Sequence, residues 1–228
     1  MPMPSTIRVA CAEILALLLA ATCAGCDQPE TMLCEACRRQ LVPAPLELRT
    51  PAGLRVRAAV PFEAVAARCI RRMKDSGETM AARPLGAVLG DVLRAERGAQ
   101  TRSRPLVAPI PTSRHSFRAR GYRVPELLLR RAGEQSERLL SVSRRSADQR
   151  GLDADQRIAN VRASMRARRQ GSGQAVMLVD DVMTTGATFD EGARALRAAG
   201  FHVVAGVALA ATPRHSERNA NASGTRRK

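Results

Sequence analysis

The sequence predicts an α/β protein with a mainly parallel sheet of about five strands flanked by helices, preceded by a small cysteine-rich module. Two apolar, β-branched-rich runs at 175–179 and 203–209 flank a helical pattern at 189–199. A strand, helix, strand order of this kind joins parallel strands through a right-handed crossover. Four cysteines at short spacing near the N-terminus predict the module.

The N-terminal part, residues 1–45, is predicted to hold a helix followed by a metal-binding module. The apolar run at 14–21 is shorter than the ~20 residues that a membrane-spanning helix needs. An export or lipoprotein signal is the alternative, because Arg8 precedes this run and cysteines follow it. Glu13 beside the run and the cysteine pattern behind it favour a cytoplasmic protein with no membrane anchor.

Two CxxC pairs lie in this part, with seven residues between them. The small residues inside each pair, Gly25 among them, allow tight turns, so that four thiolates can converge on one tetrahedral ion. The pattern predicts a closed structural Zn²⁺ site, a zinc knuckle, formed by Cys23, Cys26, Cys34 and Cys37. A disulfide or a vestigial, metal-free site is the alternative. Cys11 and Cys69 are predicted to be small buried side chains.

The main domain is predicted over residues 46–212, after a linker rich in turn residues at 43–53. Its remaining expected elements are an edge strand at 55–60, helices at 62–72 and 79–93, a strand at 106–110, a basic loop at 113–123 and a helix at 125–132. Residues 141–160 have few apolar anchors and are predicted to be mobile. Residues 213–228 are predicted to be a basic, disordered tail.

The segment VMLVDDVMTTGAT at 176–188 predicts a binding site for a sugar phosphate. Its strand leads into Asp180 and Asp181, which places two carboxylates at the carboxyl edge of a parallel sheet, where ligands bind in open α/β folds. Carboxylates accept hydrogen bonds from a vicinal diol. The loop behind them offers hydroxyls, amides and a glycine free to take a positive φ, which suits a phosphate monoester. The loop residues are Thr184, Thr185, Gly186, Ala187 and Thr188.

The same segment has a plainer interpretation as a strand, a turn and a capped helix. Thr188 and Glu191 have the spacing of a capping box, and Gly200 has the position of a helix stop. A Thr188 that caps the helix would have its hydroxyl less free for phosphate. The whole arrangement favours the sugar-phosphate site, because the strand, the double acid and the hydroxyl loop together suit one ligand geometry, a diol followed by a 5-phosphate.

This segment resembles the phosphoribosyl pyrophosphate motif of type I phosphoribosyltransferases. With the CxxC pairs, RRMK at 71–74, APIPTSRHSFRARGY at 108–122 and QRGLDADQRIANV at 149–161, the chain is similar to the ComF family over roughly residues 14–211. The resemblance implies a type I phosphoribosyltransferase-like fold, Mg²⁺ bound with phosphoribosyl pyrophosphate, and a flexible hood at 144–161. It also implies a pyrophosphate loop, whose weaker candidate residues are Arg114, Arg118, Arg120, Gly121 and Lys74.

Two details qualify this resemblance. Tyr122, Arg123 and Val124 replace the family's usual aromatic-Asn-Gln continuation, so the contacts on the acceptor side differ. Lys74 can also be interpreted as a surface lysine whose aliphatic stem covers apolar neighbours. No catalytic residue is assigned, because a general base must reach a particular proton and no histidine shows such a position in the sequence.

Two functions follow from the resemblance. One is a transferase, a glycosyltransferase of the pentosyl class, that moves ribose 5-phosphate to an unidentified acceptor. The other is a non-catalytic protein that binds phosphoribosyl pyrophosphate or a nucleotide in DNA uptake (competence) or DNA processing, with DNA-processing proteins as partners. Both functions use the same predicted sugar-phosphate site at 176–188.

Arginine carries nearly all of the positive charge, since Lys74 and Lys228 are the two lysines in a chain of net charge +16. Residues 102–150 hold twelve arginines against four acidic residues, a net +8. Such a field suits a polyphosphate or a nucleic acid, although an arginine-rich codon bias accounts for it equally. Because aromatic residues are sparse, any nucleic-acid binding is expected to be weak and electrostatic, without base stacking.

Overall fold

The computed structural model describes residues 22–99, 104–143 and 163–212. The predicted hood at 144–161, the predicted tail at 213–228 and the predicted helix before residue 22 lie outside these residues. Among the described residues, no helix has both the length and the apolarity to cross a membrane.

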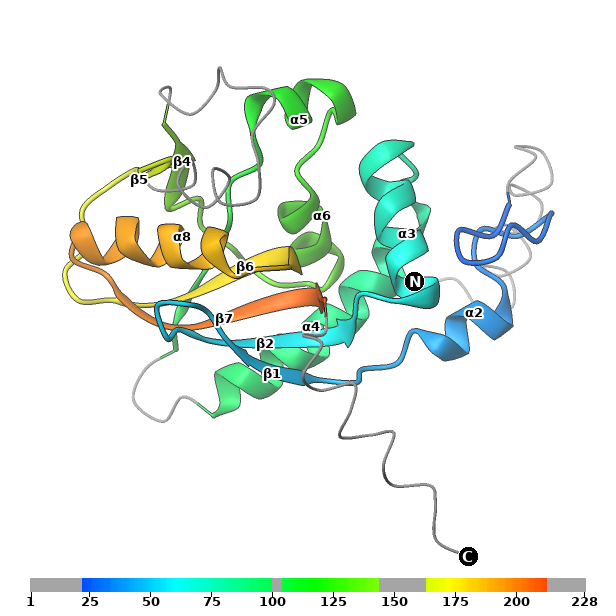
Figure 1. The fold of residues 1–228 in the computed structure, drawn as a ribbon, viewed down its shortest axis with the longest axis horizontal. Helices are drawn as coiled ribbons and strands as arrows, with labels where there is room; N and C mark the ends of the chain where they lie inside the picture. Colours follow the sequence, from blue (N-terminus) through cyan, green and yellow to red (C-terminus); the bar gives the residue numbers. More distant parts are fainter. Residues whose placement is uncertain (1–21, 100–103, 144–162, 213–228) are drawn as a thin grey trace, which may run out of the picture.

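A five-stranded sheet in the order β1-β2-β7-β6-β3 lies at the centre of the fold (Figure 1). Four strands run parallel, and β1 pairs antiparallel with β2. This arrangement confirms the predicted α/β fold with a mainly parallel sheet of about five strands. In sheet order the strands are β1 (Leu46–Arg49), β2 (Arg55–Pro61), β7 (His202–Ala211), β6 (Ala175–Met183) and β3 (Leu106–Pro109).

Helices cover both faces of the sheet (Figure 1). On β6, Met177 and Val179 pack with one helix layer, whereas Val176 and Leu178 pack against the other face, as the alternation of a strand requires. The first layer holds α3 (Ala64–Asp75), α4 (Ala82–Gly98) and α6 (Val124–Arg131), with the short 3₁₀ turn η1 (Thr79–Ala81) before α4. The second holds α8 (Ala187–Ala198) and a small hairpin of β4 (Leu140–Val142) and β5 (Met165–Ala167).

The sequence-based assignments of an edge strand and of a basic loop were wrong. The strand at 55–61 is internal rather than an edge, because Leu46–Arg49, inside the predicted linker, pair along its outer side. The predicted basic loop holds α5 (Arg114–Arg120), whose first turn is capped by the Ser113 side chain accepting from the amide of Ser116 at 3.1 Å. In both places local hydrogen bonds form a regular element, although the composition is rich in turn residues or in charge.

The remaining described helix, α2 (Glu35–Gln40), belongs to the cysteine module beside α3 (Figure 1). The module shares one buried core with the first helix layer, to which Cys23, Leu33 and Cys37 contribute together with Val65 and Ile70 of α3. The module is therefore packed onto the main domain.

Candidate functional site

The two acidic residues of the 176–188 segment lie within β6, near its carboxyl end. Asp181 faces α3, because its carboxylate contacts Lys74 of that helix. Asp181 is buried and Asp180 is partly exposed. The two carboxylates therefore sit at the predicted edge of the sheet but in different surroundings.

Lys74, near the end of α3, neutralises one of these carboxylates. Its Nζ donates to Asp181 Oδ1 at 2.7 Å, and the Asp181 side chain is 11% exposed. An ammonium group has three N–H donors, and in the part of the chain that the structure describes Asp181 takes one of them. The structure thus brings Lys74 to the carboxylate pair, as a member of the site edge rather than as an isolated surface lysine.

Tyr122 ties the α5–α6 junction to the same place. Its hydroxyl donates to the carbonyl oxygen of Met73, the residue before Lys74. Gly121, with φ of 78°, ends α5 in the left-handed conformation and turns the chain toward this contact. Sequence reasoning did not find this tether, although Tyr122 is the single tyrosine of the chain and stands where the ComF pattern departs.

The surroundings of Asp180 oppose its ionisation. Burial and the nearby charge of Asp181 raise the pKa of Asp180 to about 8, against the smaller effects of the Asp181 amide and Lys74. The Asp181 amide donates to Asp180 Oδ1 at 2.8 Å. A neutral acid here can donate a hydrogen bond as well as accept one, which suits a diol that does both.

The loop after β6 differs from the predicted capping box. The N-cap of α8 is Gly186, with φ of 83°, so Thr188 lies inside the helix and caps nothing. Glu191 accepts from the Met165 amide at 2.9 Å and from Arg194, which places it in the core beneath β5. The Met165 amide belongs to a distant strand, which the spacing rule for a capping box does not include. The predicted stop at Gly200, with φ of 86°, is confirmed.

Close packing limits the residue at the head of α8. A Cβ on Gly186 would lie 3.0 Å from both the Met183 and the Thr50 side chains. Thr50 belongs to the β1–β2 turn, in which the Ala52 amide donates to Asp190 of α8 at 3.0 Å. Met183 of β6 and the β1–β2 turn thus fix the start of α8. Thr184 and Thr185 remain exposed. A rigid helix N-terminus beside exposed hydroxyls is a suitable place for a phosphate.

The predicted pyrophosphate residues divide between α3 and α5. Arg114 and Arg118 on α5 are exposed, and Arg120 is half-buried at its end. Lys74 contacts Asp181, whereas no contact joins these arginines to the acidic pair within the described ranges. The tether from Tyr122 to Met73 is what brings the end of α5 beside Lys74.

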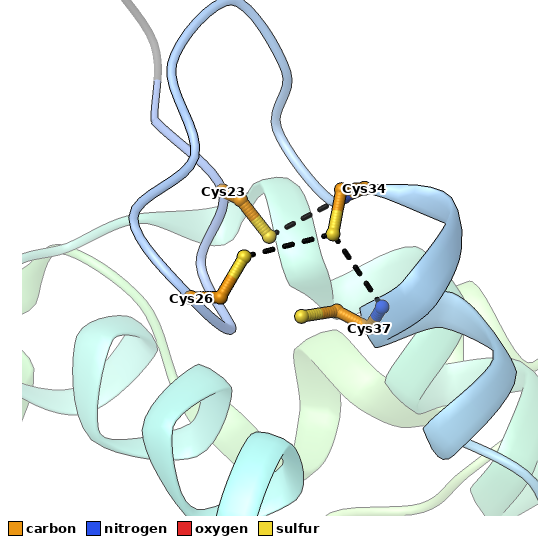
Figure 2. Close-up of side chains that lie close together, drawn as sticks. All are labelled: Cys23, Cys26, Cys34 and Cys37. Atoms are coloured by element: carbon orange, nitrogen blue, oxygen red, sulfur yellow. Dashed lines mark hydrogen bonds between the residues drawn. The ribbon is translucent and has the colours of Figure 1, made fainter.

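The four predicted metal ligands converge on one point (Figure 2). Their sulfur atoms all lie within 4.8 Å of one another, and Cys26 Sγ is 3.6 Å from Cys34 Sγ. Two sulfurs bound at about 2.3 Å to a tetrahedral ion lie roughly 3.8 Å apart, so the cluster has the size of such a site. A Cβ on Gly25 would lie 2.6 Å from Cys37 Sγ, which explains the glycine between the first two cysteines.

Backbone amides stabilise negative charge on a sulfur of the cluster. The amides of Cys34 and Gly25 donate to Cys23 Sγ at 3.3 and 3.4 Å. Burial opposes ionisation of Cys23, but these amide hydrogen bonds lower its pKa to about 6. Burial and the neighbouring sulfurs raise the pKa of Cys37 instead. One thiolate is thus stable by itself, and a bound cation would stabilise the others, so the four cysteines could bind a metal such as zinc.

The module is fastened to α3 by charge as well as by its core. Asp27 accepts hydrogen bonds from Arg68 and Arg72, and Arg72 also donates to the Thr22 hydroxyl at 3.2 Å. Cys69 of α3 is fully buried, as predicted, and burial raises its pKa to about 11. It is therefore a core side chain. Cys11 lies outside the described residues.

No family model matches the chain, and no curated protein matches it either. Among solved structures, the chain is similar to adenine phosphoribosyltransferase from Leishmania tarentolae (TM-score 0.34, 20% identity, 63% of this chain and 65% of that one). It is similar to the Leishmania donovani enzyme of that name (0.35, 18%, 62% and 58%). It is also similar to glutamine phosphoribosylpyrophosphate amidotransferase from B. subtilis (0.32, 23%, 54% and 25%). The match spans less than two thirds of each of these proteins, and at these scores it assigns no substrate.

Proposed function

We propose that the chain binds phosphoribosyl pyrophosphate together with Mg²⁺ and transfers its ribose 5-phosphate to an acceptor. The single observation that carries this proposal is the arrangement at the end of β6, where two acids precede a threonine-rich loop and a closely packed left-handed Gly186 at the head of α8. The resemblance of the same residues to the ComF family supports it.

Each part of the site has a proposed role. Asp180 and Asp181 hold the ribose diol, and residues 184–188 surround the 5-phosphate at the helix N-terminus. Lys74 lies where it can donate to the pyrophosphate while it neutralises Asp181. Arg114, Arg118, Arg120 and Gly121 complete the pyrophosphate side.

The proposed reaction is a displacement at C1 of the ribose. The bond from C1 to the pyrophosphate oxygen breaks as the acceptor nucleophile bonds to C1, and the pyrophosphate leaves with the electron pair. Mg²⁺ would supply charge neutralisation for the leaving group. Cationic side chains add to this neutralisation, because they are fixed before the negative charge develops.

Other parts of the proposal concern the rest of the chain. We propose three segments, a zinc-binding module at 1–45, the transferase-like domain at 46–212 and a basic tail at 213–228, in a cytoplasmic ComF-like protein. Cys23, Cys26, Cys34 and Cys37 would hold Zn²⁺, since their spacing and amide contacts fit a closed tetrahedral site. DNA-processing proteins, and weakly and electrostatically DNA itself, are the proposed macromolecular partners.

Calorimetry with phosphoribosyl pyrophosphate and Mg²⁺ tests the proposal, followed by mass spectrometry of the products formed with a panel of purine and pyrimidine bases. We expect the wild type to bind and the Asp180→Asn, Asp181→Asn double variant to bind at least tenfold more weakly. Absence of binding by a folded wild-type protein would refute the proposed phosphoribosyl pyrophosphate site. Binding without product across the whole panel would instead favour a non-catalytic protein that binds this ligand.

A further inference from the structure

A second feature of the same sheet edge is an open cleft of about 700 Å³. It lies where the carboxyl end of β3, the starts of α5 and α6, and the β4–β5 hairpin meet. Its volume falls in the range of small-molecule sites. The lining includes five arginines, Arg114, Arg123, Arg138, Arg166 and Arg168, and one acidic residue, Glu126.

The cleft holds an excess of unneutralised guanidinium groups. Glu126 is shared, since Arg138 donates two hydrogen bonds to it and Arg123 lies 3.7 Å from it. Counting formal charges in the lining, five arginines against one glutamate leave a net +4. Such forks of N–H donors match the two oxygens of a carboxylate or the oxygens of a phosphate.

Three other arginines of the lining, Arg114, Arg166 and Arg168, are positioned to bind a ligand. Arg168 donates from Nε to the Leu140 carbonyl at 3.0 Å, and within the described residues its terminal nitrogens have no further partner. Arg114 and Arg166 are exposed, and no ion pair is found for either among the described residues. The lining also includes apolar residues, Pro109 at the end of β3, Pro111 after it, and Leu140 and Val142 of β4.

This cleft is adjacent to the carboxylate pair. Pro109 in its wall pairs with Val179, and the next amide, of Ile110, donates to the Val179 carbonyl at 2.8 Å. Asp180, the residue after Val179, therefore lies on the strand next to this wall, and the two strands are about 4.8 Å apart. A ligand in the cleft would approach the sugar from the β3 side.

We infer that the cleft binds the acceptor, and that this acceptor carries a carboxylate or phosphate group beside a flat, apolar ring. The inference rests on the proposed function and names the acceptor's chemical class. The oxyanion is held by Arg166 and Arg168 and is unchanged by the reaction. A ring atom supplies the lone pair that forms the bond to C1 as the pyrophosphate leaves.

The test measures binding to the full-length, metal-loaded protein by calorimetry, at low and at physiological salt. The probes are phosphoribosyl pyrophosphate with Mg²⁺, inorganic pyrophosphate, pyridine and pyrimidine carboxylates, nucleoside monophosphates, and neutral adenine and uracil. We expect one anionic class to bind and the neutral bases to bind at least tenfold more weakly. The carboxylate and phosphate arms decide which oxyanion is used.

Arg166→Gln is the decisive variant because the side chain is exposed, so the fold is retained, as circular dichroism would verify. We expect at least a tenfold loss of the anionic acceptor, less than a twofold change for phosphoribosyl pyrophosphate, and partial rescue by Arg166→Lys. Arg130→Gln, on the exposed side of α6 and outside the cleft, is the matched control and should change neither affinity.

Three outcomes would overturn the inference. In the first, phosphoribosyl pyrophosphate binds but no anionic probe binds at millimolar concentration, which leaves the proposed function intact. In the second, Arg166→Gln weakens pyrophosphate and phosphoribosyl pyrophosphate as strongly as it weakens the acceptor probes, so the cleft holds the leaving group. In the third, the anions bind without any binding of phosphoribosyl pyrophosphate, which removes the proposed function and with it the role of an acceptor.

Discussion

The cysteine module and the carboxylate edge of the sheet are built in opposite ways. In the module, four ligands from a single stretch of fifteen residues, 23–37, converge, and their own backbone amides stabilise the sulfurs. At the edge, Asp180 and Asp181 are neighbours in sequence, but Asp181 is paired with Lys74 of α3, 107 positions away. Tyr122 of the α5–α6 junction in turn contacts Met73, the residue before Lys74. A site that binds a structural ion can be local, whereas a site that surrounds a substrate draws on distant elements.

The largest expected effect concerns the module. Cys37→Ser removes one of four ligands, so we expect loss of the bound ion and a fall in the free energy of unfolding on the order of 4 kcal/mol. Metal content by mass spectrometry and thermal unfolding measure it. Cys69→Ala is the control, because this buried thiol lies outside the cluster and its loss should leave one ion per chain. Full metal content in Cys37→Ser would contradict a four-cysteine site.

The next effect concerns Asp180 and the dependence of stability on pH. Its pKa of about 8 in the folded state exceeds the value of about 3.9 expected in the unfolded chain. The stabilising effect of the bound proton is therefore complete below pH ~4 and lost as the pH rises through about 8. Urea unfolding between pH 4 and 9 should show this decline in the wild type and not in Asp180→Asn. The exposed Asp91→Asn should keep the wild-type slope.

The third prediction asks whether the edge depends on its distant partner. Lys74→Met leaves Asp181 buried without a counter-charge, and we expect a loss of roughly 3 kcal/mol. Adding Asp181→Asn should recover part of that loss, because a neutral amide tolerates burial better than a carboxylate. Denaturant unfolding of both single variants and the double variant gives the coupling energy. Strict additivity would show that the contact contributes nothing.

The smallest effect concerns the head of α8. Gly186→Ala adds backbone strain and a clash with Thr50, while Gly173→Ala, at a similar φ of 81° but in open space, adds strain alone. We expect about 2 kcal/mol for the first and about 1 kcal/mol for the second. Phosphoribosyl pyrophosphate affinity should fall only in the first. Equal losses in both variants would mean that the close packing at Gly186 has no energetic weight.

The same contrast decides what could be predicted from the sequence. Cysteine spacing, the β6–α8–β7 unit and the position of Asp180 and Asp181 follow from local patterns, and the structure places them as expected. The pairing of β1 with β2 is local, but it was missed because the prolines and the glycine at 43–53 indicated a linker. The contact of Glu191 with the Met165 amide could not be predicted, because it joins residues distant in sequence. Tyr122 belongs to this second class. Its hydroxyl contacts Met73, which lies 49 positions earlier in the chain.

The two borders of the sheet also bear on how the molecule behaves among its own copies. An open strand border can recruit another chain into fibrils. On one side β1 is short, carries Glu47 and Arg49, and follows prolines at 43 and 45. On the other side the Glu137 amide already occupies the Val107 carbonyl of β3 at 2.8 Å. Both borders therefore resist strand-by-strand polymerisation.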